Sequence, residues 1–264
     1  AIGAASGNQN VGIGTDALKV NTGANNTAVG YLAMQANTSG AGNTAVGSIS
    51  MESNTTGADN AAFGRNTLGA NTTGANNVAV GLGALDANTT ASNNTAVGRS
   101  ALIANTTGGN NTAVGKFALD ANTTAANNTA VGVSSLTTNT TGTQNVAMGV
   151  SALEANTTAD YNIAVGNNAL VSNTTGTRNV GLGYIALGAN TTGSYNVGIG
   201  FEALDANTTA SSNTGIGYNV LGANTTGTEN TAVGMNAADA TTTGSYNVAM
   251  GNDALGTSTT GAEN

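Results

Sequence analysis

The sequence predicts an all-β fold, a parallel β-solenoid of about fifteen coils of seventeen residues each. A glycine recurs at intervals of seventeen from Gly30 to Gly251, after one interval of sixteen from Gly14. Such a period is typical of repeat architectures. The composition, with 39 glycines and 3% aromatic residues, argues against a thick globular core, yet 39% hydrophobic residues exceed what a disordered linker carries. A thin core repeated many times accounts for both observations.

The repeat reads N-[TV]-A-V-G-x-x-A-L-x-A-N-T-T-G-x-x, and its residues are numbered here as positions 1 to 17 of a coil. Fifteen copies occupy residues 10–264, and residues 1–9 match a shortened first coil in which Ala1-Ile2-Gly3 corresponds to positions 3 to 5. We therefore expect a single solenoid over residues 1–264. Because the repeat shows no polar cap, we expect either a longer fibre that continues past both ends or chains that stack end to end.

Positions 2 to 4 predict the strand of each coil. Position 2 is mostly Thr or Val, position 4 is always bulky, as in Ile13, Phe63 and Met250, and position 3 is only Ala or Gly. Alternation puts positions 2 and 4 on one face of the strand, and we expect position 4 in the core. We expect the small residues of position 3 to admit the backbone of a neighbouring chain.

The rest of the coil is predicted from turn chemistry and one apolar column. Glycine at position 5 ends the strand or turns with positive φ. Leu or Met fills position 9, except at Ala238, which indicates a second short, buried strand near positions 8 and 9. Asn-Thr-Thr-Gly at positions 12 to 15 forms the far corner. Frequent Gly, Asn, Thr and β-branched residues exclude helices.

Asparagine occupies position 1 in every copy, for instance at Asn10, Asn128 and Asn247. Stacked coils place each column above itself, so we expect these amides to bond the coils on either side as an asparagine ladder. The Asn-Thr-Thr at Asn54 and Asn71 also matches a glycosylation acceptor, but a structural turn explains it without modification.

The charged residues predict no catalytic, cofactor-binding or metal site, and therefore no enzyme. The sequence has no His or Cys, and its net charge of −8 comes from 13 acids and 5 bases. Asp86, Asp120, Asp205 and Asp239 share position 10 but alternate with Gly, Thr, Ile and Val, which indicates a solvated edge rather than a calcium column. Without clustered bases or a long apolar run, neither nucleic acid nor membrane insertion is expected.

Two surface features suggest a function. Adjacent threonines such as Thr72-Thr73 and Thr106-Thr107 point to opposite sides, so one Thr column per coil faces water, and ice binding through it is the alternative function. The late aromatic residues fall at positions 6 and 17, outside the coil, where they mark either a receptor or glycan contact or a lateral seam between chains, which we favour. These residues are Tyr161, Tyr184, Tyr195, Phe201, Tyr218 and Tyr246.

The segment Asn43-Thr44-Ala45-Val46-Gly47, with Ala84-Leu85 and Ala101-Leu102 placed alike in other copies, resembles the head repeats of YadA-type trimeric autotransporter adhesins and is similar to repeats of phage tail fibres. The coil here is longer, in its Asn-Thr-Thr-Gly corner. The resemblance implies a left-handed β-roll, a homotrimer and attachment to a host-surface or glycan receptor. We expect an extracellular, structural or adhesive fibre on a cell surface or virion, assembled as a homotrimer or an end-to-end filament.

Overall fold

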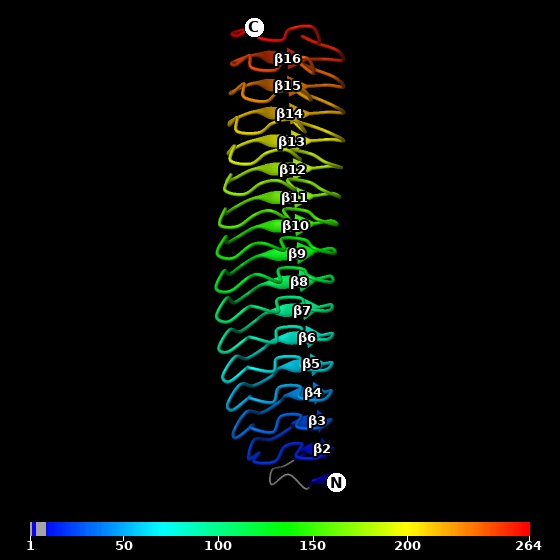
Figure 1. Cartoon of the computed structure of the whole chain (residues 1–264), viewed down its shortest axis with the longest axis vertical. Coiled ribbons are helices and arrows are strands. Elements are labelled where there is room, and N and C mark those ends of the chain that lie inside the picture. Colours follow the sequence, from blue (N-terminus) through cyan, green and yellow to red (C-terminus); the bar gives the residue numbers. More distant parts are fainter. Residues whose placement is uncertain (1, 4–8) are drawn as a thin grey trace. The chain divides into compact units, whose positions relative to one another are not determined.

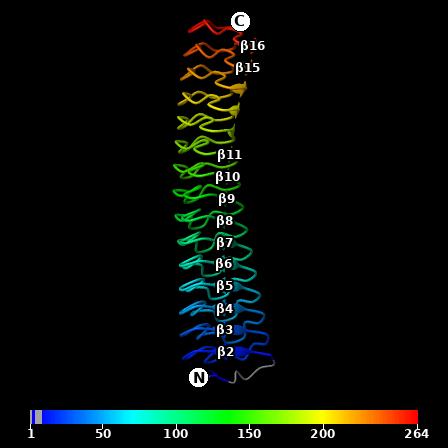
Figure 2. The same ribbon diagram turned by 90° about the vertical axis from the view of Figure 1, so that its right-hand side faces the viewer.

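The computed structural model describes residues 2–3 and 9–264. The chain divides into two compact units, unit 1 (Ala1–Asn128) and unit 2 (Thr129–Asn264). Each unit is a stack of coils with one short strand per coil, and the described residues contain no helix (Figures 1 and 2). The predicted all-β parallel solenoid is confirmed. Its handedness, and the single domain over residues 1–264, stay predictions.

Unit 1 contains strands β1 to β8. From β2 onward they pair in parallel, and equal positions of successive coils face each other, as Thr44 faces Ala61. Strand β1 pairs antiparallel with β2, with Ile2 opposite Ile13, whereas a first coil of the repeat would pair in parallel. The strands are β1 (Ile2–Gly3), β2 (Val11–Ile13), β3 (Thr27–Val29), β4 (Thr44–Val46), β5 (Ala61–Phe63), β6 (Val78–Val80), β7 (Thr95–Val97) and β8 (Thr112–Val114).

Unit 2 contains strands β9 to β16, all parallel and in the same register. They occupy positions 2 to 4 of their coils, so the predicted location of the strand is confirmed. The strands are β9 (Thr129–Val131), β10 (Val146–Met148), β11 (Ile163–Val165), β12 (Val180–Leu182), β13 (Val197–Ile199), β14 (Thr214–Ile216), β15 (Thr231–Val233) and β16 (Val248–Met250).

The strand face that turns inward is the opposite of the one predicted. In β7, Ala96 is fully buried, while Thr95 and Val97 on either side of it are half-buried. The interior has room only for a small residue, since a Cβ on Gly198 would lie 3.2 Å from Cγ of Leu187 in the preceding coil. The prediction that position 4 lies in the core is therefore wrong. Position 3 packs against its own core rather than admitting another chain.

Positions 6 to 11 form a sequence of turns, so the predicted second strand near positions 8 and 9 is wrong. The backbone adopts positive φ at position 7 and again at position 9, as at Ser100 (58°) and Leu102 (52°). Position 9 is nevertheless buried as predicted, and Leu102 is fully inaccessible. Burial of each such leucine contributes about 1.5–3 kcal/mol. The turns stay bonded to neighbouring coils, since the Leu102 N–H donates to the Ala118 carbonyl at 3.0 Å.

Glycine at position 5 has the positive φ that the sequence predicted, between 118° and 144° along the chain. It also lies against the glycine of the next coil, and a Cβ on Gly98 would lie 2.5 Å from the carbonyl oxygen of Gly115. Both the backbone conformation and the close stacking of coils therefore require glycine here.

The predicted ladder at position 1 is confirmed, and a second ladder lies at position 12. Asn43 accepts a hydrogen bond from the N–H of Asn60 at 3.0 Å through Oδ1, and its own Nδ2 donates to the Gly57 carbonyl at 2.8 Å. At position 12, Nδ2 of Asn88 donates to Oδ1 of Asn71 in the preceding coil at 2.9 Å. Position 12 was predicted only as part of the far corner, and its asparagines are buried because their amides join successive coils.

The position-12 ladder ends at Thr241, and this change leaves a polar group unsatisfied. Thr241 replaces asparagine and bonds the Ser258 carbonyl at 3.0 Å instead of the coil before it. Oδ1 of Asn224 is consequently buried without a hydrogen-bond partner, one of two such side-chain atoms among the described residues. An unmade bond of this kind is costly in a buried site.

We expect Thr241→Asn to stabilise unit 2 by about 1 kcal/mol, because the new amide would donate to Oδ1 of Asn224. The measurement is the urea midpoint followed by circular dichroism, with hydrogen exchange in the coils around residue 241. Thr243→Asn, at exposed position 14, serves as the control and should change little. A Thr241→Asn variant no more stable than this control would contradict the account.

Candidate interaction surface

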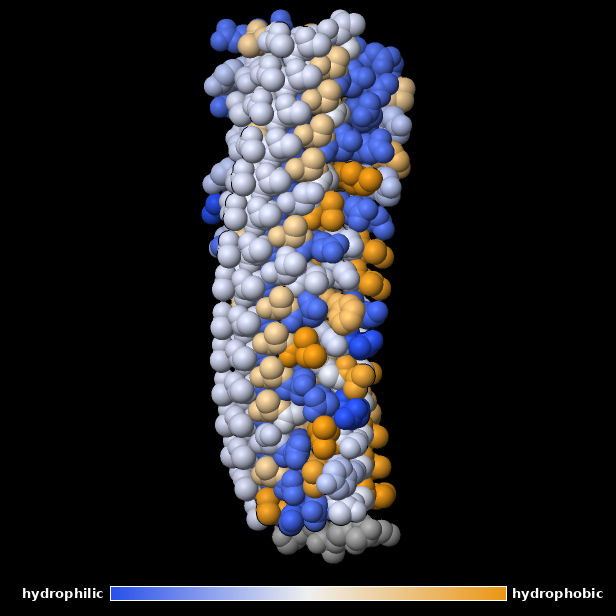
Figure 3. Space-filling model, in the orientation of Figure 1, coloured by the Kyte–Doolittle hydropathy of each residue, from blue (hydrophilic) through white to orange (hydrophobic). Residues whose placement is uncertain are grey.

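Large exposed hydrophobic residues gather on one part of each coil. All of them except Val20 lie at positions 2, 4, 6 or 17. Figure 3 shows hydrophobic side chains along the right-hand margin of the view and a paler, more uniform band along the left. We call positions 2 and 4 the sheet face. Its exposed hydrophobic members are Val11, Ile13, Phe63, Val78, Val80 and Val114 in unit 1, and Met148, Ile163, Val165, Ile216, Val248 and Met250 in unit 2.

The sheet face is apolar because the interior cannot hold its side chains. Alternation along a strand forces positions 2 and 4 outward once position 3 points inward. The face is therefore a largely β-branched, water-exposed sheet surface, with Thr at position 2 in seven of the fifteen coils. Large contiguous apolar patches are common at the interaction sites of soluble proteins.

Column 6, the position-6 residues after the strands, is basic in unit 1. Arg65, Arg99 and Lys116 lie there, with the exposed Leu82 between the two arginines. The Lys116 ammonium lies 4.7 Å from the ring centroid of Phe117, and the Arg99 guanidinium lies 5.7 Å from it. Three of the five bases of the chain thus border the sheet face of unit 1.

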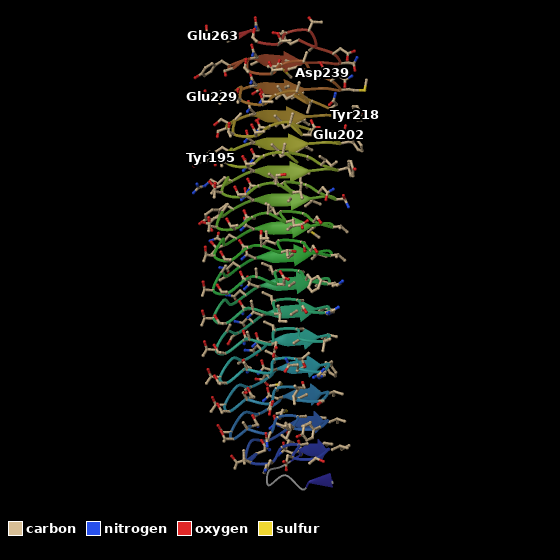
Figure 4. All side chains as sticks on the ribbon, viewed as in Figure 1. Tyr195, Glu202, Tyr218, Glu229, Asp239 and Glu263 are labelled. Carbon is tan, nitrogen blue, oxygen red and sulfur yellow. The ribbon has the colours of Figure 1, made fainter. Side chains whose placement is uncertain are left out.

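Column 6 of unit 2 is aromatic instead. The rings of Tyr184 and Phe201 stack with centroids 5.0 Å apart, and those of Phe201 and Tyr218 with centroids 5.5 Å apart. Because the faces cover one another, the stack presents ring edges and tyrosyl hydroxyls to solvent. Figure 4 shows Tyr218 at the right of the view, on the side where the strands end. The predicted outward placement of these aromatics is confirmed.

Column 17, the position-17 residues before each strand, contains a stack of one arginine and two tyrosines in unit 2. The Arg178 guanidinium lies 5.1 Å from the Tyr161 ring centroid and 5.5 Å from that of Tyr195, and its Nη1 donates to the Tyr195 hydroxyl at 3.1 Å. Arg178 is thus held between two tyrosines of the neighbouring coils. Tyr195 and Glu229 lie at the left of Figure 4.

The two threonine columns differ in exposure, because position 13 is half-buried in most coils whereas position 14 is exposed, although Thr22 and Thr38 of position 13 also face water. At position 13, Oγ1 of Thr106 donates to the Thr123 carbonyl of the next coil at 3.0 Å. At position 14, Thr107 is exposed. Each full corner therefore offers solvent one threonine hydroxyl that is not used in this coil-to-coil bond. The asparagines of the Asn-Thr-Thr sequences, such as Asn54, are buried and hydrogen-bonded.

The aspartates of position 10 do not assemble into a site. Burial raises the pKa of Asp86, Asp120 and Asp205 above the ordinary value. Within the described residues no group of three or more His, Cys, Asp or Glu side chains could hold a metal ion. The absence of a catalytic, cofactor or metal site stays a prediction.

Asp205 differs from the other two aspartates because, in addition to burial, a second negative charge, that of Glu202, raises its pKa. Burial and then the charge of Glu202 raise its pKa, the backbone N–H groups of Ala206 and Asp205 lower it in part, and its Oδ1 is buried without a hydrogen-bond partner. A pKa raised by folding means that the native state binds this proton more tightly than the unfolded chain. This contribution to stability is complete below pH about 4 and is lost as pH rises through the folded pKa.

We expect Asp205→Asn to raise the melting temperature at pH 7, where the wild-type carboxylate is charged, and to change it little near pH 3.5. Thermal unfolding of both proteins across this pH range measures the difference. Glu229→Gln, at an exposed position, is the control. If the gain in melting temperature did not shrink on acidification, the charge of the Asp205 carboxylate would not be its cause.

No protein-family model, curated protein or solved structure matches this chain. Among the described residues, no helix is long and apolar enough to cross a membrane.

Proposed function

We propose that this chain is a non-catalytic structural element of an extracellular fibre, on a cell surface or virion, and that it self-associates through the sheet face and column 6. The observation that carries the proposal is that the large exposed hydrophobic residues, apart from Val20 and the tyrosines of column 17, lie in these columns. Water exposure of such a face is unfavourable, and a second copy of the chain would cover it. The assembly is a homotrimer, or a filament in which copies joined through these faces extend end to end.

The proposal includes adhesion, as the resemblance to adhesin heads implies. The exposed ring edges and hydroxyls of Tyr184 and Tyr218 suit contact with a glycan or a host-surface protein. The coil itself supports the structural role, because the asparagine ladders join each coil to the next through side chains as well as backbone.

Sedimentation velocity over a range of protein concentrations tests self-association. We expect the wild-type chain to sediment as an oligomer, with the mass of three chains for a trimer or a growing mass for a filament. The double variant Val78→Lys/Val80→Lys puts two charges on β6 of the sheet face and should remain monomeric with an unchanged circular dichroism spectrum. Thr73→Lys/Thr90→Lys, on exposed column 14, should associate as the wild type does. A monomeric wild type would refute the proposal.

Ice binding remains the second candidate, favoured by the exposed threonine that recurs at position 14. Since the position-13 hydroxyl donates to a carbonyl of the next coil, as in Thr106, a coil with Thr at position 14 offers one such threonine hydroxyl rather than two. This observation favours the fibre. Thermal hysteresis of the purified chain separates the two functions. Freezing-point depression that disappears in the Thr73→Lys/Thr90→Lys variant would replace the fibre proposal with ice binding.

A further inference from the structure

The two units differ in charge although they share one repeat. Unit 1 holds four of the five bases and five of the thirteen acids, and unit 2 holds one base and eight acids. Their formal charges are therefore −1 and −7. Two copies that associate with unit 2 against unit 2 bring two charges of −7 together, whereas contact of unit 1 with unit 2 opposes −7 only to −1 and so reduces the repulsion.

Column 6 makes the same distinction residue by residue. In unit 1, three successive coils present Arg65, Leu82 and Arg99, and in unit 2 three successive coils present Tyr184, Phe201 and Tyr218. In both sets, successive side chains lie one coil apart, because the two units share the same backbone repeat. An apolar residue thus lies between two arginines in one set, and between two tyrosines in the other.

The chemistry of the two sets is complementary. The hydroxyls of the stacked tyrosines can accept hydrogen bonds from guanidinium groups, while Leu82 and Phe201, both more than two-fifths exposed, can cover each other. The chain already uses this hydrogen bond internally, since Nη1 of Arg178 donates to the Tyr195 hydroxyl at 3.1 Å. Hydrogen bonds with a charged donor are stronger than neutral ones.

We infer that copies of this chain associate with column 6 and the sheet face of unit 1 in one copy against those of unit 2 in another. The inference rests on the proposed self-association and identifies the partner surface. Contact of unit 1 with unit 1 would instead oppose two rows of cations formed by Arg65, Arg99 and Lys116. A copy that makes one such contact keeps its other patch free for a further copy, which favours a staggered filament over a trimer whose chains lie in register.

Cysteine cross-linking tests the pairing directly, since the chain has no cysteine of its own. Leu82→Cys and Phe201→Cys are prepared as separate full-length chains with tags of different mass, mixed and mildly oxidised. Both positions are exposed, and circular dichroism checks that the fold is kept. We expect the mixed disulfide in about tenfold excess over each symmetric one, the ratio that about 1.4 kcal/mol of preference gives. Thr90→Cys, on column 14, replaces Leu82→Cys as the control and should not cross-link.

Each outcome separates this inference from the self-association on which it rests. Symmetric Leu82→Cys dimers in excess would establish contact of unit 1 with unit 1 and overturn the inference while leaving the fibre intact. Oligomers in sedimentation without any mixed disulfide would do the same. A wild-type chain that stays monomeric would overturn both this inference and the proposed self-association. Arg65→Gln/Arg99→Gln in the Leu82→Cys chain should reduce the mixed disulfide, and an undiminished yield would contradict the role of the arginines.

Discussion

Gly98→Ala is expected to destabilise unit 1 by about 2–6 kcal/mol, the combined cost of a strained backbone and of overpacking. Gly98 has a φ of 135°, which L side chains rarely adopt. Its added Cβ would lie 2.5 Å from the Gly115 carbonyl oxygen and 2.7 Å from its carbon. The coils cannot separate there without breaking the bond from the Gly115 N–H to the Val97 carbonyl at 2.8 Å. The urea midpoint followed by circular dichroism measures the loss.

Gly251→Ala is a matched control for this prediction. Gly251 occupies the same position with a φ of 118°, but nothing lies within 4 Å of its added Cβ. It should cost only the strain, about 1–3 kcal/mol. Equal losses in the two variants would show that coil stacking at position 5 tolerates a methyl group, against the argument from close approach.

The features that sequence reasoning predicted correctly are those whose chemistry has one explanation. Glycine at position 5 and leucine at position 9 recur with a period that only a solenoid explains, and Gly98 and Leu102 have the positive φ and the burial expected of them. Asparagine at position 1 likewise has few uses in a stacked coil other than a ladder. The parallel register then follows from the period itself.

Alternation alone could not predict which face of the strand turns toward the interior. Thr95 and Val97 look like core residues because they are β-branched and flank a small residue, whereas the interior accepts only Ala96 between them. Variation in size carried the missing signal. Position 3 never exceeds alanine, while position 4 ranges from Val97 to Phe63 and Met250, a tolerance that indicates an open surface.

The second ladder was also missed, because asparagine is a turn residue as well as a ladder residue. Asn88 precedes Thr-Thr in a segment that resembles a corner, and nothing local distinguishes the two roles. The signal lay in the column, where asparagine persists from Asn21 to Asn224 as regularly as at position 1. A turn accepts Asp, Ser or Gly in some coils, whereas an amide that both donates and accepts has no equivalent substitute.

Asn88→Ala is expected to cost about 2–6 kcal/mol, since two buried groups lose their partners at about 1–3 kcal/mol each. Asn88 donates to Asn71 at 2.9 Å and accepts from Asn105 at 3.0 Å. The Ala91 carbonyl keeps a donor in Asn77 at 2.9 Å, so Oδ1 of Asn71 and one N–H of Asn105 bear the loss. Urea unfolding measures it, and Thr90→Ala, at exposed position 14, should stay within about 0.5 kcal/mol of the wild type.

Asn88→Asp separates the hydrogen bonds of the amide from the space that the side chain fills, because aspartate has nearly the same volume. The carboxyl group keeps an acceptor for Asn105 but loses the donor to Asn71, and at neutral pH it buries a charge. Burial raises the pKa of this carboxyl, so the variant should be least stable at pH 7 and should regain stability as acid protonates it, whereas Asn88→Ala should lack this gain. If the two variants lost the same stability at every pH, the side chain would act only by filling space, and the position-12 ladder would contribute no more than packing.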